Sequence, residues 1–212
     1  MSVLWGELTS EEIRAAAVEQ VLVILPCGCT EQHGHHLPVD TDTWQVEHLC
    51  RQGALLARER YGVHALILPP LPFGPASEHF GMPGTISLPN EVWISVVKVI
   101  LWSVLDSGFT RVAAMRGCGG HWALPGALWD LKAEATRAGR DVTIRLLDVA
   151  SGWKEIQESI FPGADGGHAA VMETALCLAE RPGLVRHDRI TVPILDQLHE
   201  RYVDAGEVFL FN

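Results

Sequence analysis

Short apolar runs alternate with amphipathic segments along this chain. Four runs, at 21–26, 64–68, 111–115 and 142–147, are rich in Val, Ile, Leu and Ala, which is typical of strands buried on both faces of a sheet. Around them, apolar residues recur at helical spacing over 10–18, 43–60, 90–108, 122–138 and 171–179. Strands that alternate with helices predict parallel βαβ units. We therefore expect an α/β fold, a three-layer α/β/α sandwich around a mostly parallel sheet.

Capping residues mark the ends of several of these helices. Thr9 is followed three residues later by Glu12, the spacing of a capping box, ahead of the first helix. Asn90 is the expected N-cap of the apolar helix that follows it, and Gly62 is expected just beyond the helix over 43–60. The segment 71–90, rich in proline and glycine, predicts a long ordered loop, and such loops inside a domain are usually functional.

Composition limits the class of protein. The 212 residues suit one domain, 1–212, and 48% apolar with 20% charged residues is an ordinary globular composition. A formal net charge of −10, with no basic stripe, argues against a nucleic-acid partner. No signal-like leader and no membrane-spanning apolar stretch is visible, so we expect no membrane partner. The five cysteines form no CxxC pair, which favours a reducing compartment and a cytoplasmic location.

The densest polar segment, 31–42, follows the apolar run at 21–26. It carries three carboxylates and three imidazoles in twelve residues. Open α/β sheets place their sites in loops that leave the carboxyl ends of strands. A cation would relieve the repulsion between these carboxylates, so Glu31, His33 and Asp42 are candidate metal ligands. In the alternative, Asp42 only caps the following helix and the histidines are surface polar residues.

Two more polar groups occur where loops of a parallel sheet converge. One is the turn Arg116-Gly-Cys-Gly-Gly-His121 after the run at 111–115, and the other is His168 with Glu173. His168 and Glu173 are five positions apart, or about 140° around a helix. Both can face one site only if His168 lies in the loop and Glu173 in the helix. Alone, the pair is equally compatible with Glu173 as an ordinary helix-surface carboxylate.

Together these segments resemble the creatininase (creatinine amidohydrolase) family of metal-dependent amide hydrolases. The resemblance spans roughly residues 5 to 186, in the family's order. It implies a creatininase-like fold, a homo-oligomer, usually a hexamer described as a trimer of dimers, and a centre of two ions, usually zinc, manganese or iron. The residues that carry it are Pro26-Cys-Gly-Cys-Thr-Glu31 through Asp42, Ser77-Glu-His79 through Ser87, Gly108-Phe-Thr-Arg-Val, the turn 117–121, and His168 through Thr174.

The resemblance also implies roles for single residues. Glu31 would bind one metal, His33 the other, and Asp42 would bridge them, with Glu173 as a further metal carboxylate. His168 would handle protons, as a histidine does in creatininase during ring opening. Trp153 matches a pocket tryptophan of creatininase. Ser77 and His79, in the loop 71–90 that would shape the pocket, are candidates for substrate contact.

The third motif departs from the family pattern. Members typically carry Asn-Gly-His-Gly-Gly-Asn, or a version with Glu at the fifth place, where this chain has Arg116-Gly-Cys118-Gly-Gly-His121. Three outcomes are open: Cys118 ligates a softer metal such as zinc, His121 reaches back in its place, or the first metal position is empty. Cys118 could instead be a nucleophile with His121 as a catalytic partner.

The candidate metal ligands together with the resemblance imply a metal-dependent hydrolase of a C–N bond, whether amide, cyclic amide or formamide, in a small molecule or a modified peptide. A metal-activated water would attack the carbonyl, and His168 would protonate the leaving nitrogen. One or two divalent ions per chain are expected, with zinc first and iron or manganese as alternatives. The loop from Trp153 to His168 is short and lacks the second tryptophan that closes over creatinine in creatininase, so the resemblance does not extend to creatinine as the substrate. The alternative is a metal-poor relative that binds a small molecule or scaffolds an assembly without hydrolysis.

Overall fold

A four-stranded parallel sheet lies at the centre of the structure, which is a computed structural model describing residues 2–148, 150–163 and 167–190. The strand order is β2-β1-β3-β4, and every pairing between these strands is parallel. The predicted α/β class is therefore confirmed, and each strand falls within two residues of its predicted bounds. The strands are β1 (Leu22–Cys27), β2 (Ala65–Ile67), β3 (Arg111–Arg116) and β4 (Thr143–Asp148).

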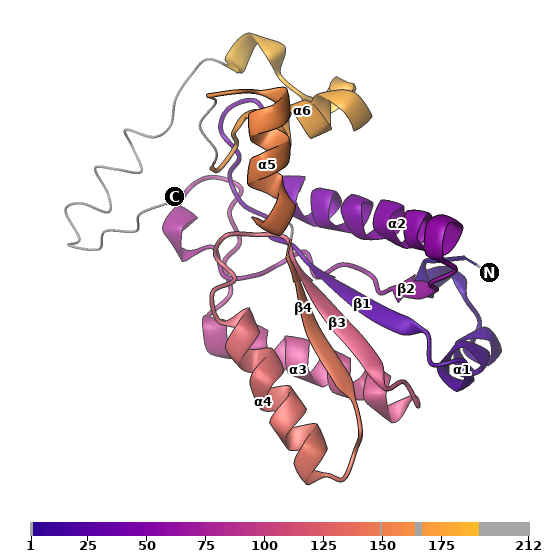
Figure 1. The fold of residues 1–212 in the computed structure, drawn as a ribbon. Coiled ribbons are helices and arrows are strands. Elements are labelled where there is room, and N and C mark those ends of the chain that lie inside the picture. The colour runs from indigo at the N-terminus through magenta and orange to yellow at the C-terminus, as the bar shows by residue number, and fades with distance from the viewer. Residues whose placement is uncertain (1, 149, 164–166, 191–212) are drawn as a thin grey trace.

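Helices cover both faces of this sheet, as Figure 1 shows, with α2 on one side and α3 and α4 on the other. Side chains of a strand alternate between the faces, and β1 follows this rule. Val23 and Leu25 pack in the cluster that contains α3 and α4, whereas Ile24 packs in the cluster that contains α2. The expected three-layer sandwich results. The helices are α1 (Ser10–Val18), α2 (Thr41–Tyr61), α3 (Asn90–Asp106), α4 (Leu124–Arg137), α5 (Ala150–Ile160) and α6 (Val171–Glu180).

The helix ends test the capping predictions. Thr9 and Glu12 form the predicted capping box at the start of α1. Gly62 follows α2 in the left-handed conformation, with φ of 63°, where glycine carries no Cβ penalty. The prediction for Asn90 was wrong, because Pro89 holds the N-cap position and Asn90 is the first residue of α3. Proline fits the extended conformation of that N-cap.

Helix α5 was missed by the sequence analysis. Its apolar residues Ile156 and Ile160 are exposed, and Gly152 lies near its start. A weakly buried helix with an early glycine has few of the signals that predict one. Beyond α6, the segment to 190 forms two 3-10 turns, Pro182–Leu184 and His187–Arg189. Among the described helices, none combines the length and apolarity needed to cross a bilayer.

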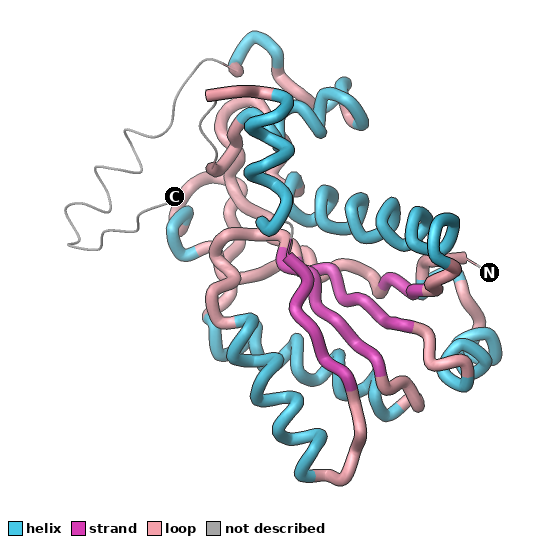
Figure 2. Tube along the Cα trace, viewed as in Figure 1, coloured by secondary structure: helices cyan, strands magenta, loops and turns pink. Residues whose placement is uncertain are grey.

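Loops leaving the carboxyl ends of β1 and β3 gather at one edge of the sheet (Figure 2). Cys27 and Arg116, the last residues of these strands, are partners in the parallel register. The turn after β3 packs closely on the end of β1, because the backbone N–H of Gly117 donates to the carbonyl oxygen of Cys27 at 2.9 Å. A Cβ on Gly117 would lie 2.6 Å from that oxygen and 2.6 Å from Cβ of Val46. This close packing fixes the backbone position of the next residue, Cys118.

We predict that Gly117→Ala lowers the free energy of unfolding by about 1–3 kcal/mol, since the added methyl group forces apart β1, α2 and the turn. Gly119→Ala is the matched control in the same turn, because a Cβ there has no heavy atom within 4 Å. Chemical denaturation of both variants measures the difference. Equal stability of the two variants would contradict the close packing of the turn.

Candidate metal centre

The segment after β1 carries three buried ligand-type side chains in alternation. Cys29, Glu31 and His33 are at most 1% exposed. Extended chain places alternate residues on one side, and the loop 71–90 holds this segment in place. Thr30 pairs with Ile86 in an antiparallel bridge, and the hydroxyl group of Thr85 accepts the backbone N–H of Gln32 at 3.0 Å.

Asp42 points into this segment from the first turn of α2. Its Oδ1 lies 3.1 Å from Nε2 of His33, and the side chain is buried. The alternative that Asp42 is a helix cap was wrong, because Asp40 holds that position and Asp42 is the second residue of the helix. Asp40 instead pairs with Arg181 through two contacts of 3.0 Å.

The imidazole of His33 is oriented as in a metal ligand. Its Nδ1–H donates to the carbonyl oxygen of Glu31 at 3.1 Å, which leaves Nε2 facing Asp42 and, at 3.9 Å, Oε2 of Glu173. A carbonyl that accepts one ring N–H commonly fixes the tautomer of a metal-binding histidine. Burial opposes the charge on this ring, but Asp42 and Glu173 outweigh it and raise the pKa of His33 to about 9.

The carboxyl groups here are buried and crowded. Burial and the neighbouring Asp42 raise the pKa of Glu31 to about 10, and burial raises the pKa of Glu173 to about 7. Burial also tends to raise the pKa of Asp42, but the neighbouring His33 has the larger net effect and lowers it. Oδ2 of Asp42 and Oε2 of Glu173 are buried without a hydrogen-bond partner within the described ranges. A buried carboxylate oxygen without a donor is costly, and a cation satisfies it.

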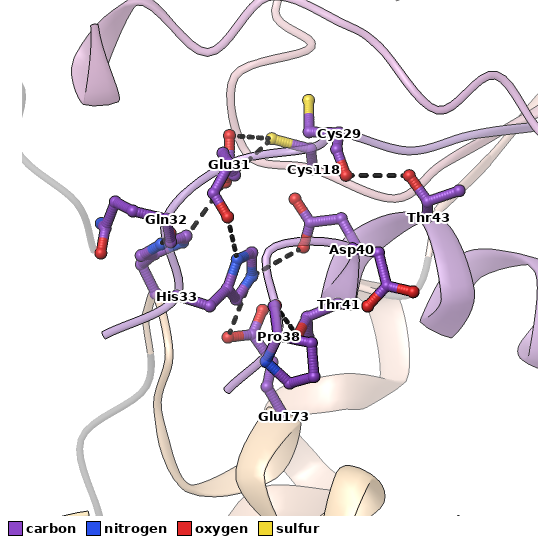
Figure 3. A network of polar contacts seen from close by, with 12 residues as sticks. Cys29, Glu31, Gln32, His33, Pro38, Asp40, Thr41, Thr43, Cys118 and Glu173 are labelled. Atoms are coloured by element: carbon purple, nitrogen blue, oxygen red, sulfur yellow. Dashed lines mark hydrogen bonds and ion pairs between the residues drawn. The ribbon is translucent and has the colours of Figure 1, made fainter. Parts of the chain in front are cut away.

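Two groups of ligand atoms converge on this space, and in each group the atoms lie within 4.8 Å of one another. One consists of His33, Asp42 and Glu173, and the other of Cys29, Glu31, Asp42 and Cys118. Figure 3 shows Glu31, His33, Cys118 and Glu173 directed toward this space. Asp42 belongs to both groups, the placement expected of a bridging ligand. Carboxylate, imidazole and thiol donors fit a divalent metal ion.

His168 lies in the loop before α6 and Glu173 in its first turn, the arrangement that the sequence analysis required. Nε2–H of His168 donates to the carbonyl oxygen of Gln32, so Nδ1 faces the buried carboxyl groups and lies 3.4 Å from Oε1 of Glu31. Its side chain is 22% exposed, against 2% for Glu31. Burial and the nearby rings of His33 and His79 lower the pKa of His168 to about 3.

The three predicted substrate contacts lie in different surroundings. His79 is buried, stacks on His168 at a centroid distance of 4.1 Å, and places Nε2 3.7 Å from Oε1 of Glu31. Ser77 is exposed at the start of a 3-10 turn, Ser77–His79. Trp153 belongs to α5, but its side chain lies outside the described part of the structure. Substrate contact by these residues stays a prediction.

Cys118 contacts the cluster rather than a catalytic base. Its Sγ lies 3.7 Å from both carboxylate oxygens of Glu31 and accepts the backbone N–H of Gly120 at 3.3 Å. The neighbouring thiol of Cys29 and burial raise its pKa well above the ordinary value. A nucleophilic cysteine needs the opposite shift, which argues against the nucleophile hypothesis. Nε2 of His121 faces Cys29 instead, at 3.2 Å, and burial lowers the pKa of His121 to about 4.

Cys29 was not predicted as a site residue. The signal was its place two residues before Glu31 and four before His33, the alternation that puts all three on one side of an extended segment. Nothing in the sequence reveals that His121, 92 residues further along the chain, would meet it.

Comparisons with known proteins agree with this geometry. A family model described as creatinine amidohydrolase matches residues 6–206. The creatinine amidohydrolase of Pseudomonas putida is 32% identical over 208 residues, covering 89% of this chain and 76% of that protein. The mycofactocin precursor peptide peptidase of Mycolicibacterium smegmatis is 32% identical over 190 residues, covering 87% and 67%.

Solved structures show the same likeness. A crystal structure of creatinine amidohydrolase matches with a TM-score of 0.78 and 29% identity, covering 89% of this chain and 76% of that one. Two further creatininase structures, one a mutant of the Zn-Zn type and one described with Mn, match with the same TM-score of 0.78 and 28% identity, and each covers 89% of this chain.

We predict that Asp42→Asn loses bound metal and the stabilisation that metal gives, because both groups of ligands share this carboxylate. Asp40→Asn is the matched control, two residues away and outside both groups. Elemental analysis and melting with and without added metal provide the test. Full metal content in Asp42→Asn would contradict the assignment.

We further predict that the chelated protein loses stability as pH rises from about 6.5 to about 9. Across this window the folded chain keeps protons on Glu31 and His33, with pKa values raised to about 10 and 9, that the unfolded chain has released, and Glu173, with a pKa of about 7, loses its proton early in the window. His79, His121 and His168, with pKa values lowered to about 4, 4 and 3, raise stability with pH only below about 6.5, so they do not oppose the loss. Urea midpoints at the two pH values test this, and a higher midpoint at pH 9 would refute it.

Proposed function

This chain belongs to the creatininase family, as its motifs predicted, and from that premise we propose that it is a metal-dependent hydrolase of C–N bonds. The bond is an amide, cyclic amide or formamide in a small molecule or a modified peptide. The relatives support this range, because one is named an amidohydrolase and another a peptide peptidase.

The observation that carries the proposal is Asp42, a buried carboxylate shared by two converging groups of metal-ligand atoms. When bound there, divalent metal would polarise a carbonyl group and lower the pKa of water, which supplies a nucleophile at neutral pH. Glu31, Asp42, His33 and Glu173 would hold it, and the bare oxygens of Asp42 and Glu173 fit that purpose. A binder without metal has no evident use for these buried charges.

His168 is placed to move a proton at the edge of the cluster. Its Nε2–H is held by the carbonyl of Gln32, and Nδ1 faces Glu31 at 3.4 Å. The ring lies between those of His33 and His79, both at a centroid distance of 4.1 Å. The stacked rings fix its orientation, and its partial exposure gives it access to a substrate. We assign His168 the transfer of a proton to the leaving nitrogen: its bare Nδ1 would first accept the proton released by the attacking water and then donate it to that nitrogen.

The metal is divalent, with zinc favoured for this chain because its ligand groups include thiols, which bind zinc well and manganese poorly. Related solved structures include a Zn-Zn type and one with Mn. We propose one or two ions per chain, within a single domain over 1–212. Assembly as a homo-oligomer, a hexamer by family resemblance, and a cytoplasmic location complete the proposal.

The function is tested with a panel of amides, cyclic amides, formamides and short modified peptides, assayed with chelated and zinc-loaded protein. Turnover of one class, present with zinc and absent after chelation, supports the proposal. Creatinine belongs in the panel as the substrate we expect to be inactive. Tight metal binding without turnover of any class would favour a binding function instead.

We predict that His168→Ala keeps its metal but loses about 10²- to 10⁴-fold in turnover, the usual contribution of a general acid. His35→Ala is the control, since His35 is exposed in the same loop as His33. Elemental analysis must accompany the assay, because Glu31, His33 and His168 also present ligand atoms within 4.8 Å of one another. Metal lost together with activity would make His168 a ligand and overturn its role as an acid.

A further inference from the structure

A further group of ligand-type side chains lies next to the buried carboxyl groups. Cys29, Cys118 and His121 present ligand atoms within 4.8 Å of one another, and all three residues are buried. Cys29 comes from the segment after β1, and the other two come from the turn after β3, the neighbouring strand. Neither the motifs nor the comparisons assign a role to Cys29.

We propose that Cys29, Cys118 and His121 form a sulfur-rich metal position that binds a thiophilic divalent cation such as zinc. This inference rests on the proposed function, because Cys29 and Cys118 also belong to the group with Glu31 and Asp42. The centre would then have two unlike positions: a thiol and imidazole position at Cys29, and a carboxylate and imidazole position at His33, Asp42 and Glu173.

The distances suit such an ion. Zinc binds sulfur at about 2.3 Å and nitrogen at about 2.0–2.1 Å, which separates a sulfur and a nitrogen ligand by about 3.5 Å in a tetrahedral site. Sγ of Cys29 and Nε2 of His121 are 3.2 Å apart. Sγ of Cys118 lies 3.7 Å from the carboxylate of Glu31, which offers a fourth donor.

The backbone at Gly74 passes close to the ligand atoms of His121 and Cys29. A Cβ on Gly74 would lie 2.3 Å from Nε2 of His121 and 3.0 Å from Sγ of Cys29. Gly74 cannot withdraw easily, because its carbonyl accepts the N–H of Leu88 at 3.0 Å and it forms a bridge with Ser87. A glycine is therefore required where these two polar atoms meet, as expected where backbone passes close to a site.

His121 has a second feature that suits a ligand. It is fully buried and stacks on Trp93 at a centroid distance of 4.3 Å, so the ring is rigidly held. Its Nδ1 is buried without a hydrogen-bond partner in the part of the chain that the structure describes. A thiol contact at Nε2 alone leaves this histidine poorly satisfied for a buried polar residue. A metal bond at Nε2 would stabilise the buried ring more strongly than this thiol contact does, although Nδ1 would still lack a partner.

The alternative is a purely structural cluster of two thiols and a neutral imidazole. Both cysteines pack with Ala76 in a small apolar cluster, which a structural role would equally produce. The two readings differ in what happens when a thiophilic metal is added, since only a ligand site forms sulfur–metal bonds.

The test titrates Cd²⁺ into chelated full-length protein and follows the ultraviolet charge-transfer band of thiolate bound to cadmium. The wild type should show a band from two thiolates, and Cys29→Ser and Cys118→Ser should each retain about half of it, because serine oxygen is a poor ligand for a soft metal. The double variant should show none. His121→Asn should keep the band and bind Cd²⁺ more weakly.

Cys50→Ala is the control, because Cys50 is a buried thiol on α2 in a separate apolar cluster. Its band should equal that of the wild type. If a serine variant fails to fold, ¹¹³Cd NMR of the unaltered protein replaces it, since the chemical shift reports how many sulfurs bind the ion. A shift that indicates two sulfurs supports the proposal.

A full band in Cys29→Ser, or cadmium bound to the wild type with no sulfur ligand, would overturn the sulfur-rich position. The proposed function would survive that result if Asp42→Asn still loses its metal. No metal bound by the wild type at all would count against both proposals.

Discussion

The crowding of carboxyl groups in a buried space is the constraint on which this structure depends. Glu31, Asp42 and Glu173 meet at the carboxyl edge of the sheet, with His33 as the nearest compensating charge. Burying a carboxylate costs free energy unless a partner stabilises its charge. The imidazole of His33 pairs with one oxygen of Asp42, but one oxygen each of Asp42 and Glu173 has no hydrogen-bond partner within the described residues. Without a cation, protons must take its place, which is why the pKa values of Glu31 and Glu173 rise to about 10 and 7.

Much of the fold was predictable because it rests on local patterns. Four buried strands and five of the six longer helices follow from apolar periodicity, and the capping box at Thr9 and the turn at Gly62 follow from short-range geometry. Helix α5 escaped because its exposed Ile156 and Ile160 gain little from burial. The prediction of Asn90 as the N-cap was wrong because Pro89, the residue before it, already has the extended backbone of an N-cap.

In the site, too, local features could be predicted from the sequence and contacts between distant segments could not. The segment 31–42 was identifiable because it is continuous in sequence, and the placement of His168 before Glu173 followed from helix geometry. Contacts between distant segments were beyond reach. His121 was considered as a partner of Cys118 three residues away, yet its nitrogen faces Cys29. Cys118 and His121 do lie near each other, but the direct contact of the ring, which stacks on Trp93, is with the thiol of Cys29 from the neighbouring segment.

The proposed centre of two unlike positions would give the departures of this chain from its family a common explanation. Cys118 and His121 both differ from the usual motif, and both converge with Cys29. Sulfur at one position would draw zinc, while oxygen and nitrogen at the other accept a wider range of ions. Such a chain would keep metal-dependent hydrolysis and favour zinc over manganese at one of the two positions.

The central claim is that these buried carboxylates enclose a cation, and it is tested most directly by locating the ion. Crystals of the zinc-loaded protein, measured at the zinc absorption edge, would give an anomalous difference map. A peak bounded by His33, Asp42 and Glu173 is the predicted result. An empty map there, with His33 and Asp42 still in direct contact, would contradict the claim.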